Sequence, residues 1–347
     1  MLPFSIRSIL FVACSIVCLA CLVEEVGGNQ TQKKKICGLT LVAPPKPFAS
    51  DPMQPLLDIH CNWIAVVPYG FTPMGRPEVR YGSNHQWWGE SPDGVRKTIS
   101  LAQQVNLKTM LKPQVWSHGW WTGDYNFETE QDWLKWENDY EAYILFYAEL
   151  ADSLNVDLFC LGTEFKMAVK SRPQFWLDLI VKVRDRYQGP LTYAANWDNF
   201  SQIPFWDKLD FIGINAYFPL TDAKDPGLMQ LKKAWKKPVR EIRACHQKHN
   251  KPVIFTEYGY LSVDGPAHNT WELEHNLPDL NENQSAQASA IDALHHVFAR
   301  EPYWQGGFLW KWYPGMQGHE GHPKKDYTPQ GKKAEKILAQ WFLAQSN

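Results

Sequence analysis

Eight short apolar runs alternate with helix-like segments from one end of the chain to the other. The runs cover residues 36–43, 61–68, 107–115, 156–162, 191–195, 209–216, 252–257 and 306–310. Runs that are almost continuously apolar suit strands buried on both faces, and their alternation with helices predicts a parallel sheet with covering helices. Eight repeats favour a single α/β domain, a closed (β/α)₈ TIM barrel over residues 36–347, with an open doubly wound sheet as the alternative.

Helix signals occupy the segments between these runs. The predicted helices cover about 93–105, 129–154, 175–187, 227–250, 282–300 and 328–344. The third of them follows Ser171-Arg172-Pro173-Gln174, which has the spacing of a capping box and a proline in the first turn.

Long irregular stretches follow the second, third, seventh and eighth runs, at 69–91, 117–128, 261–281 and 314–327. In a barrel, such loops build the active-site face. Their tryptophan and tyrosine content argues against disorder. The chain has 17 tryptophans, and several lie in polar loop sequence: Trp87-Trp88, Trp116, Trp120-Trp121 and Trp197. Aromatics grouped in loops suggest a binding surface, and their flat apolar faces suit sugar rings.

Two of the apolar runs end in a glutamate. Glu164 follows the fourth run and Glu257 closes the seventh, where barrel enzymes keep catalytic groups. We expect these strands to face each other, so that both carboxylates reach one cleft, as hydrolysis of a glycosidic bond requires. A separation of about 5–5.5 Å would make the reaction retaining, with a nucleophile and an acid/base. Two unrelated glutamates, one at a helix start and one in a salt bridge, are the alternative.

Other side chains near the strand ends are candidate sugar contacts. An amine and an amide could bind sugar hydroxyls, and tryptophans could stack on sugar rings. A structural role is the alternative for each. The candidate substrate-binding residues on this basis are Lys112, Gln114, Trp116, Trp120, Asn196 and Trp197.

The strand-end sequences resemble those of a known family. The segments that carry the resemblance are 107–116, Gly162-Thr163-Glu164, Thr256-Glu257-Tyr258-Gly259 and 327–332. They look most like glycoside hydrolase family 113, within the clan of retaining (β/α)₈ glycosidases, over residues 36–344. The resemblance implies a mainly endo-acting β-1,4-mannanase, with Glu164 as the acid/base and Glu257 as the nucleophile.

The same resemblance suggests roles for two aromatic residues and shows one departure. Tyr217 fits the tyrosine that hydrogen-bonds the nucleophile, and Trp310 fits the tryptophan platform beneath the sugar; core packing is the alternative for both. Most of the clan places asparagine directly before the acid/base, to hold the sugar 2-hydroxyl, and here that residue is Thr163. Because threonine is shorter, we expect stacking on the loop tryptophans, Trp120 above all, to hold most of the substrate.

Charge and motifs exclude other classes. The chain has 35 basic and 37 acidic residues, which leaves no electrostatic footprint for nucleic acid, and no phosphate-binding glycine motif follows an early strand. Retaining hydrolysis needs no metal or cofactor, so His319-Glu320-Gly321-His322 should face substrate or solvent. Cys37, Cys61, Cys160 and Cys245 are too scattered for a disulfide scaffold; the first two could pair, but isolated buried thiols fit better.

The first 22 residues have the pattern of an export signal. Arg7 precedes an apolar stretch that is short for a membrane span, and an uncleaved signal anchor is the alternative. Leu19-Ala20-Cys21 resembles the end of a bacterial lipoprotein signal, although Cys18 is a poor match to its pattern. Residues 23–35 are polar and resemble a flexible tether. We expect an exported protein, either secreted or held at the cell envelope through a lipidated Cys21.

The lipid anchor is testable in a bacterial host. The wild-type protein should fractionate with membranes, and Cys21→Ser should not be lipidated, because the modification needs the Cys21 thiol. Mass spectrometry of the mature N-terminus checks this, and a free N-terminus elsewhere, such as beyond Val26, would contradict it.

Together these features predict an exported, monomeric retaining glycoside hydrolase that acts on β-linked oligo- or polysaccharide, with β-1,4-mannan as the expected substrate. Another β-glycanase of the clan, such as a glucanase, is the nearest alternative. A non-catalytic surface glycan-binding protein is the alternative from another class, and the intact pair of Glu164 and Glu257 argues against it.

Overall fold

Eight parallel strands close into a barrel. The structure, a computed structural model, describes residues 34–83, 86–316 and 323–346, and Lys34–Asn347 form one compact unit. Each predicted run overlaps one barrel strand, and every neighbouring pair is parallel. In order around the barrel the strands are β1 (Ile36–Leu41), β10 (Trp304–Trp312), β9 (Val253–Tyr258), β8 (Ile212–Asn215), β7 (Leu191–Asn196), β6 (Leu158–Thr163), β4 (Lys108–Leu111) and β2 (Trp63–Val66).

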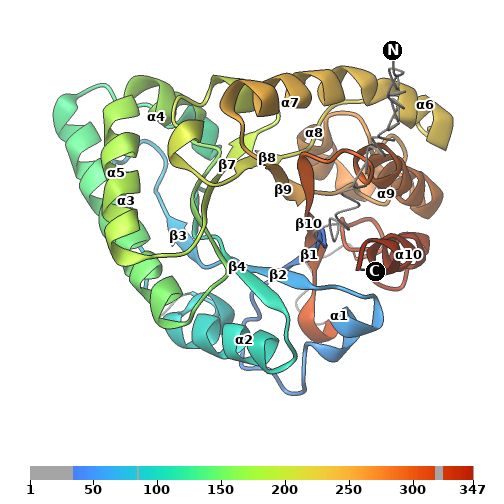
Figure 1. The fold of residues 1–347 in the computed structure, drawn as a ribbon, viewed down its shortest axis with the longest axis horizontal. Helices are drawn as coiled ribbons and strands as arrows, with labels where there is room; N and C mark the ends of the chain where they lie inside the picture. The colour runs from blue at the N-terminus through green and yellow to red at the C-terminus, as the bar shows by residue number, and fades with distance from the viewer. Residues whose placement is uncertain (1–33, 84–85, 317–322, 347) are drawn as a thin grey trace, which may run out of the picture. The chain divides into compact units, whose positions relative to one another are not determined.

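Helices cover the outside of these strands (Figure 1). Local capping explains where the first long ones begin, because Ser91 and Thr129 each accept a backbone N–H three residues ahead. The helices are α1 (Gln54–Asp58), α2 (Pro92–Gln104), α3 (Glu130–Ser153), α4 (Lys166–Ser171), α5 (Pro173–Arg186), α6 (Leu228–Ala234), α7 (Lys236–His249), α8 (Thr270–His275), α9 (Gln284–Phe298) and α10 (Lys333–Ser346).

Two apolar layers hold the barrel together. Inside it, most strands contribute to one small cluster: Ile36, Ala65, Met110, Leu158, Cys160, Ala194, Ile254 and Phe308. A larger layer between the strands and the helices is rich in fully buried aromatic rings, such as the stacked pair Trp136 and Tyr140. The interior is therefore filled, as in other barrels of this kind, and room for chemistry remains only at the ends of the strands.

The third predicted strand is split in the structure. Pro113 lacks an N–H for the barrel ladder, and the chain turns away after Lys112. The following residues form β5 (Gln114–Trp116), which pairs in parallel with β3 (Tyr69–Phe71) in a separate two-stranded sheet. This sheet was not predicted, and it begins the loops that follow the second and third barrel strands.

Three other boundaries differ from the prediction. The capping box was wrong: Ser171 ends α4, Arg172 occupies the N-cap position of α5 without a side-chain cap, and its guanidinium pairs with carboxylates of α3. The last helix begins at Lys333 rather than near residue 328. Lys35, predicted as the end of a flexible tether, is buried and donates to the carbonyls of Glu301 and Trp304 (3.0 and 2.7 Å).

Several predictions concern residues that the structure does not describe. The export signal, Cys21 and most of the tether lie outside the described residues, as does the segment from His319 to His322. Within the described residues, no helix is long and apolar enough to cross a membrane, and no three potential metal ligands lie together. The four cysteines after the leader are buried thiols, as predicted.

Candidate active site

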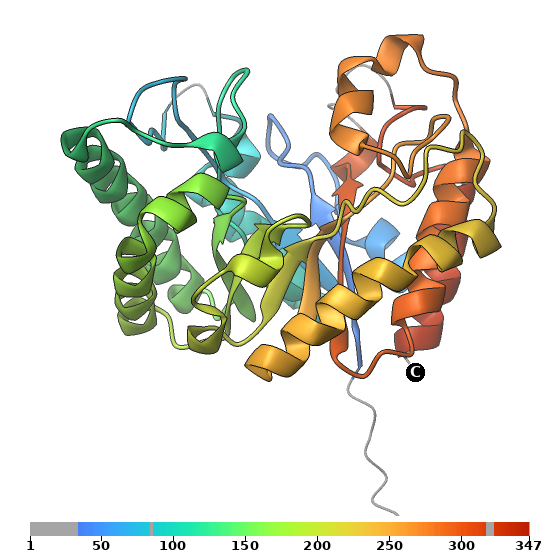
Figure 2. The same cartoon turned by 90° about the horizontal axis from the view of Figure 1, so that it is seen from above.

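Both glutamates lie at the C-terminal end of the barrel. Glu164 directly follows β6 and Glu257 lies in β9, with β7 and β8 between these strands. They are three strands apart in a ring of eight, one short of the opposed arrangement that the sequence suggested. The two carboxylates are close enough for the charge of Glu257 to raise the pKa of Glu164. Figure 2 shows the loop at 117–128 and helix α8 on one edge of the barrel.

Glu257 is held by three donors. Lys112 Nζ and Gln114 Nε2 both donate to its Oε1, the latter at 2.8 Å. Tyr217 Oη donates to its Oε2 at 2.9 Å, the contact that the family resemblance implies. The Lys112 side chain is completely buried and that of Glu257 is only 8 % exposed, so this ion pair is shielded from water. These donors fix the position and orientation of the Glu257 carboxylate.

Glu164 is in a different environment. Burial, followed by the charge of Glu257, raises the pKa of Glu164 to about 7. Two neutral donors oppose this shift: Trp121 Nε1 donates to its Oε2 (2.8 Å) and Asn215 Nδ2 to its Oε1 (3.0 Å). A carboxyl group with a pKa near neutrality can both donate and accept a proton at physiological pH.

The backbone at Glu164 is strained. Its φ of 58° lies in the left-handed region, which is uncommon for a residue with a side chain. Backbone hydrogen bonds hold it there, from Glu164 N to Ala194 O (2.8 Å) and from Lys166 N to Glu164 O (2.7 Å). Strain of this kind typically costs about 1–3 kcal/mol and is concentrated at functional sites.

Two predicted sugar-binding residues have another partner. Lys112 and Gln114 were expected to contact sugar hydroxyls, but both donate to Glu257. They can do so because the turn at Pro113 directs both side chains toward the same carboxylate oxygen. The ammonium group of Lys112 also lies 5.5 Å from the ring centre of Trp310, the predicted sugar platform, which is half-buried.

In the loop after β5, Trp121 contacts Glu164, whereas the residue predicted to bind substrate is its neighbour Trp120. Trp120 is half-buried and packs on Tyr125, with ring centres 4.2 Å apart, and on Phe127. Trp121 is exposed and reaches Glu164. Trp121, rather than the predicted Trp120, is thus the residue of this pair that contacts Glu164, and substrate binding by Trp120 stays a prediction. Trp116 is exposed and lies against Phe71, with ring centres 5.0 Å apart.

The two residues predicted after the fifth run, Asn196 and Trp197, contact side chains other than the two glutamates. Asn196 Nδ2 donates to Asp198 Oδ1 (3.1 Å). Trp197 is half-buried, and one face is stacked on Trp271 of α8, with ring centres 5.8 Å apart and an interplanar angle of 18°. Trp271 is the exposed member of this pair.

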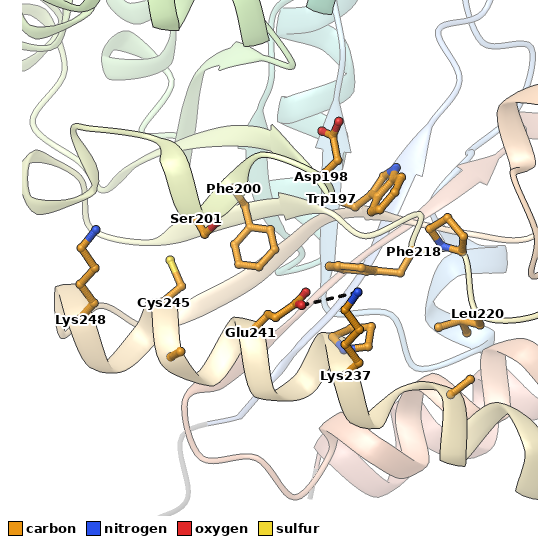
Figure 3. Close-up of a pocket in the computed structure, with 14 residues that line it drawn as sticks. Trp197, Asp198, Phe200, Ser201, Phe218, Leu220, Lys237, Glu241, Cys245 and Lys248 are labelled. Atoms are coloured by element: carbon orange, nitrogen blue, oxygen red, sulfur yellow. Dashed lines mark ion pairs between the residues drawn. The ribbon is translucent and has the colours of Figure 1, made fainter.

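A pocket of about 790 Å³ lies behind Trp197. Figure 3 shows it between helix α7 and the segments that follow β7 and β8, with Phe200 and Phe218 in its lining and a Lys237–Glu241 ion pair (4.0 Å) beside it. Neither Glu164 nor Glu257 lines this pocket. We place the chemistry at the glutamate pair, because paired carboxylates in unlike environments can transfer a proton and the pocket lining does not contain such a pair.

Sequence reasoning did not select three residues of the site. Asn215, at the end of β8, is buried and contacts Glu164, while Thr256 Oγ1 donates to Asn215 Oδ1 (2.8 Å) and fixes the amide. Trp121 is the third. Thr163 Oγ1 is buried and has no hydrogen-bond partner among the described residues. The amide that contacts Glu164 belongs to Asn215 on β8. An asparagine ending an apolar run was the available signal for Asn215.

Comparisons with known proteins identify the family of this chain. The sequence model of Glycoside Hydrolase Family 113 matches residues 45–332, most of the chain. The chain belongs to glycoside hydrolase family 113. No curated protein is significantly similar to this family 113 enzyme in sequence.

Solved structures that resemble this family 113 enzyme include other members of the family. It is 27% identical to a family 113 β-mannanase from Alicyclobacillus acidocaldarius, with a TM-score of 0.78, covering 90% of this chain and 98% of the other. A second family 113 β-1,4-mannanase is 25% identical, with a TM-score of 0.76 and coverages of 90% and 99%. A β-glucuronidase from Ruminococcus gnavus, 14% identical with a TM-score of 0.60, shares the fold over 89% of this chain and 50% of its own. The protein is thus a (β/α)₈ glycoside hydrolase.

Proposed function

We propose that the enzyme is a retaining endo-β-1,4-mannanase with Glu257 as the nucleophile and Glu164 as the acid/base. The observation that carries the assignment of roles is the difference between the two carboxylates. Glu257 accepts from a buried ammonium group, an amide and a phenol, whereas Glu164 has a pKa of about 7. Family membership and the likeness to solved β-mannanases support mannan as the substrate.

The reaction would proceed in two steps. In the first, Glu257 attacks the anomeric carbon while Glu164 gives its proton to the glycosidic oxygen, so that the sugar–oxygen bond breaks and a glycosyl ester of Glu257 forms. In the second, Glu164 takes a proton from water, and the water oxygen replaces Glu257 at the anomeric carbon. The strained backbone of Glu164 fixes its carboxyl relative to Glu257, which both steps require.

Substrate and stereochemistry are tested together. Reducing-sugar release should be greatest on β-1,4-mannan in a panel of soluble β-glycans, and NMR should show the β-anomer of the product first. Viscosity should fall early, because endo action cuts chains internally. Preference for a β-glucan would overturn the mannan assignment, and initial release of the α-anomer would overturn retention.

A further inference from the structure

Trp121 combines two properties that separate residues usually supply. Its indole N–H donates to Glu164, yet 39 % of the residue is exposed. By contrast, the donors to Glu257 are buried or half-buried. The exposed aromatic surface at the catalytic pair therefore lies on the Glu164 side. An acid/base protonates the leaving-group oxygen, so the sugar that departs must pass next to this side chain.

The loop that carries Trp121 is built to present it. Ser117 and Trp120 form an antiparallel bridge, and Trp120 packs on the buried ring of Tyr125. Asp124 N donates to Trp121 O (3.0 Å), closing the short helix η2 (Thr122–Asp124), which packs against α4 directly after Glu164. Trp120 therefore anchors the loop, and Trp121 extends from it toward the acid/base.

The absence of a side chain at Gly123 makes room for the indole of Trp121. The six-membered ring of Trp121 folds back over Gly123 so closely that a Cβ there would overlap three ring atoms. The backbone of Gly123 is ordinary, with no positive φ that would itself demand glycine. The glycine thus makes space for the ring, and the ring orientation sets the hydrogen bond to Glu164.

We propose that Trp121 stacks on the departing sugar while its N–H positions Glu164, so that one side chain couples leaving-group binding to the acid/base. This inference rests on the proposed role of Glu164. Trp121 is a positioning and specificity-determining residue: the ring selects substrates whose leaving group is a sugar, and the N–H holds the carboxyl that protonates it.

Several charged or titratable groups surround Glu164 and must stay unchanged in a test. Those that interact with it electrostatically are Glu257, Lys112, Tyr193 and Tyr217. On the elements packed beside it, α4 carries Lys166, which pairs with Asp198, and η2 carries Asp124. None of these is altered by a substitution at Trp121, so a shift in the pH profile would report the lost N–H.

Two substitutions separate the roles of ring and N–H. Trp121→Phe keeps an aromatic face but removes the donor, and Trp121→Ala removes both. Because the hydrogen bond from Trp121 lowers the pKa of Glu164, Trp121→Phe, which removes the donor but keeps an aromatic ring, should move the basic limb of kcat/KM to higher pH. Only Trp121→Ala should raise KM for mannotetraose, by about tenfold for one lost aromatic contact. Trp341→Phe is the matched control and should change neither, because the indole N–H of Trp341 donates to Asp292 (2.8 Å) instead of a catalytic candidate.

A substrate without a leaving sugar completes the test. β-Mannobiosyl fluoride releases fluoride, which has no ring to stack, so Trp121→Ala should leave its KM unchanged. Gly123→Ala should reproduce the losses of Trp121→Ala, since it displaces the ring without altering it. An unmoved basic limb in Trp121→Phe, or equal losses on the tetraose and the fluoride in Trp121→Ala, would overturn the coupling.

One readout does not depend on the substrate. A ¹³C NMR titration of the Glu164 carboxyl should show a higher pKa in Trp121→Phe than in the wild type. If the wild type hydrolyses no β-mannan, the proposed substrate fails, and this titration then tests Trp121 by itself: equal titrations of wild type and variant would overturn its role.

Discussion

Glu257→Ala should abolish turnover, lowering kcat by at least about 10⁴-fold, because a covalent intermediate cannot form without the carboxylate. Azide should restore activity by occupying the space that the carboxylate leaves. It would attack the β-glycoside from the nucleophile's face, so the product should be the α-glycosyl azide. Kinetics with an activated aryl glycoside, followed by NMR of the product, measures both effects.

Glu164→Ala should have the opposite signature. Substrates with activated leaving groups should be spared, since they need little protonation, and azide should intercept the glycosyl–enzyme to give the β-azide. The wild-type kcat/KM should fall as pH rises through about 7, because the pKa of Glu164 is about 7 and the acid must be protonated. That basic limb should disappear in Glu164→Ala.

A second glutamate provides a matched control. Burial also raises the pKa of Glu90 to about 7. Glu90 lies in the short helix η1 (Trp88–Glu90), outside the strands that carry Glu164 and Glu257. Glu90→Gln should therefore keep the basic limb and the activity. If azide gave the β-product with Glu257→Ala and the α-product with Glu164→Ala, the two roles would be reversed.

The barrel could be predicted because burial on both faces leaves a direct record in the sequence. Each of its eight strands, β6 and β9 among them, overlaps an apolar run, and a carboxylate at the end of such a run cannot be explained by packing. The small β3–β5 sheet left no such record, since its strands have three residues each and depend on where Pro113 turns the chain. Its existence is a tertiary effect.

The sequence predicted which residues lie near the strand ends but not which groups their side chains contact. Lys112 was recognised as a polar residue at a strand end, yet its partner is on β9, far away in sequence. No local pattern states whether an ammonium group meets a carboxylate or a sugar hydroxyl. Trp120 and Trp121 posed the same difficulty at shorter range, because no local pattern states that Trp121 contacts Glu164 while Trp120 packs on Tyr125. Asn215 depends on the alignment of β8 beside β9 and β7.

Lys112→Met tests the largest of these differences between sequence and structure. The substitution keeps most of the side-chain length but removes the only ammonium group recorded as bonded to Glu257 in the described part of the chain. Breaking a buried ion pair on one side typically costs about 3–5 kcal/mol, because the remaining charge is uncompensated. The substitution also removes a donor that holds the Glu257 carboxylate in place, and a misplaced nucleophile reacts slowly.

We therefore expect kcat/KM of Lys112→Met to fall roughly 10²–10³-fold at neutral pH. The loss should fall mainly on kcat, because Lys112 contacts the nucleophile rather than the substrate in this assignment. Lys108→Met is the control on the same strand: that lysine is largely exposed, pairs with Asp157 at 3.8 Å, and should contribute little.

The contrary result would be equally clear. If Lys112 binds sugar hydroxyls, as its position at a strand end first suggested, Lys112→Met should raise KM while kcat stays unchanged. The burial of its side chain argues against this, because an ammonium group already bonded to a carboxylate and shielded from the cleft has little left to offer a sugar. A comparison of KM and kcat for this one variant thus decides whether Lys112 serves the nucleophile or the substrate.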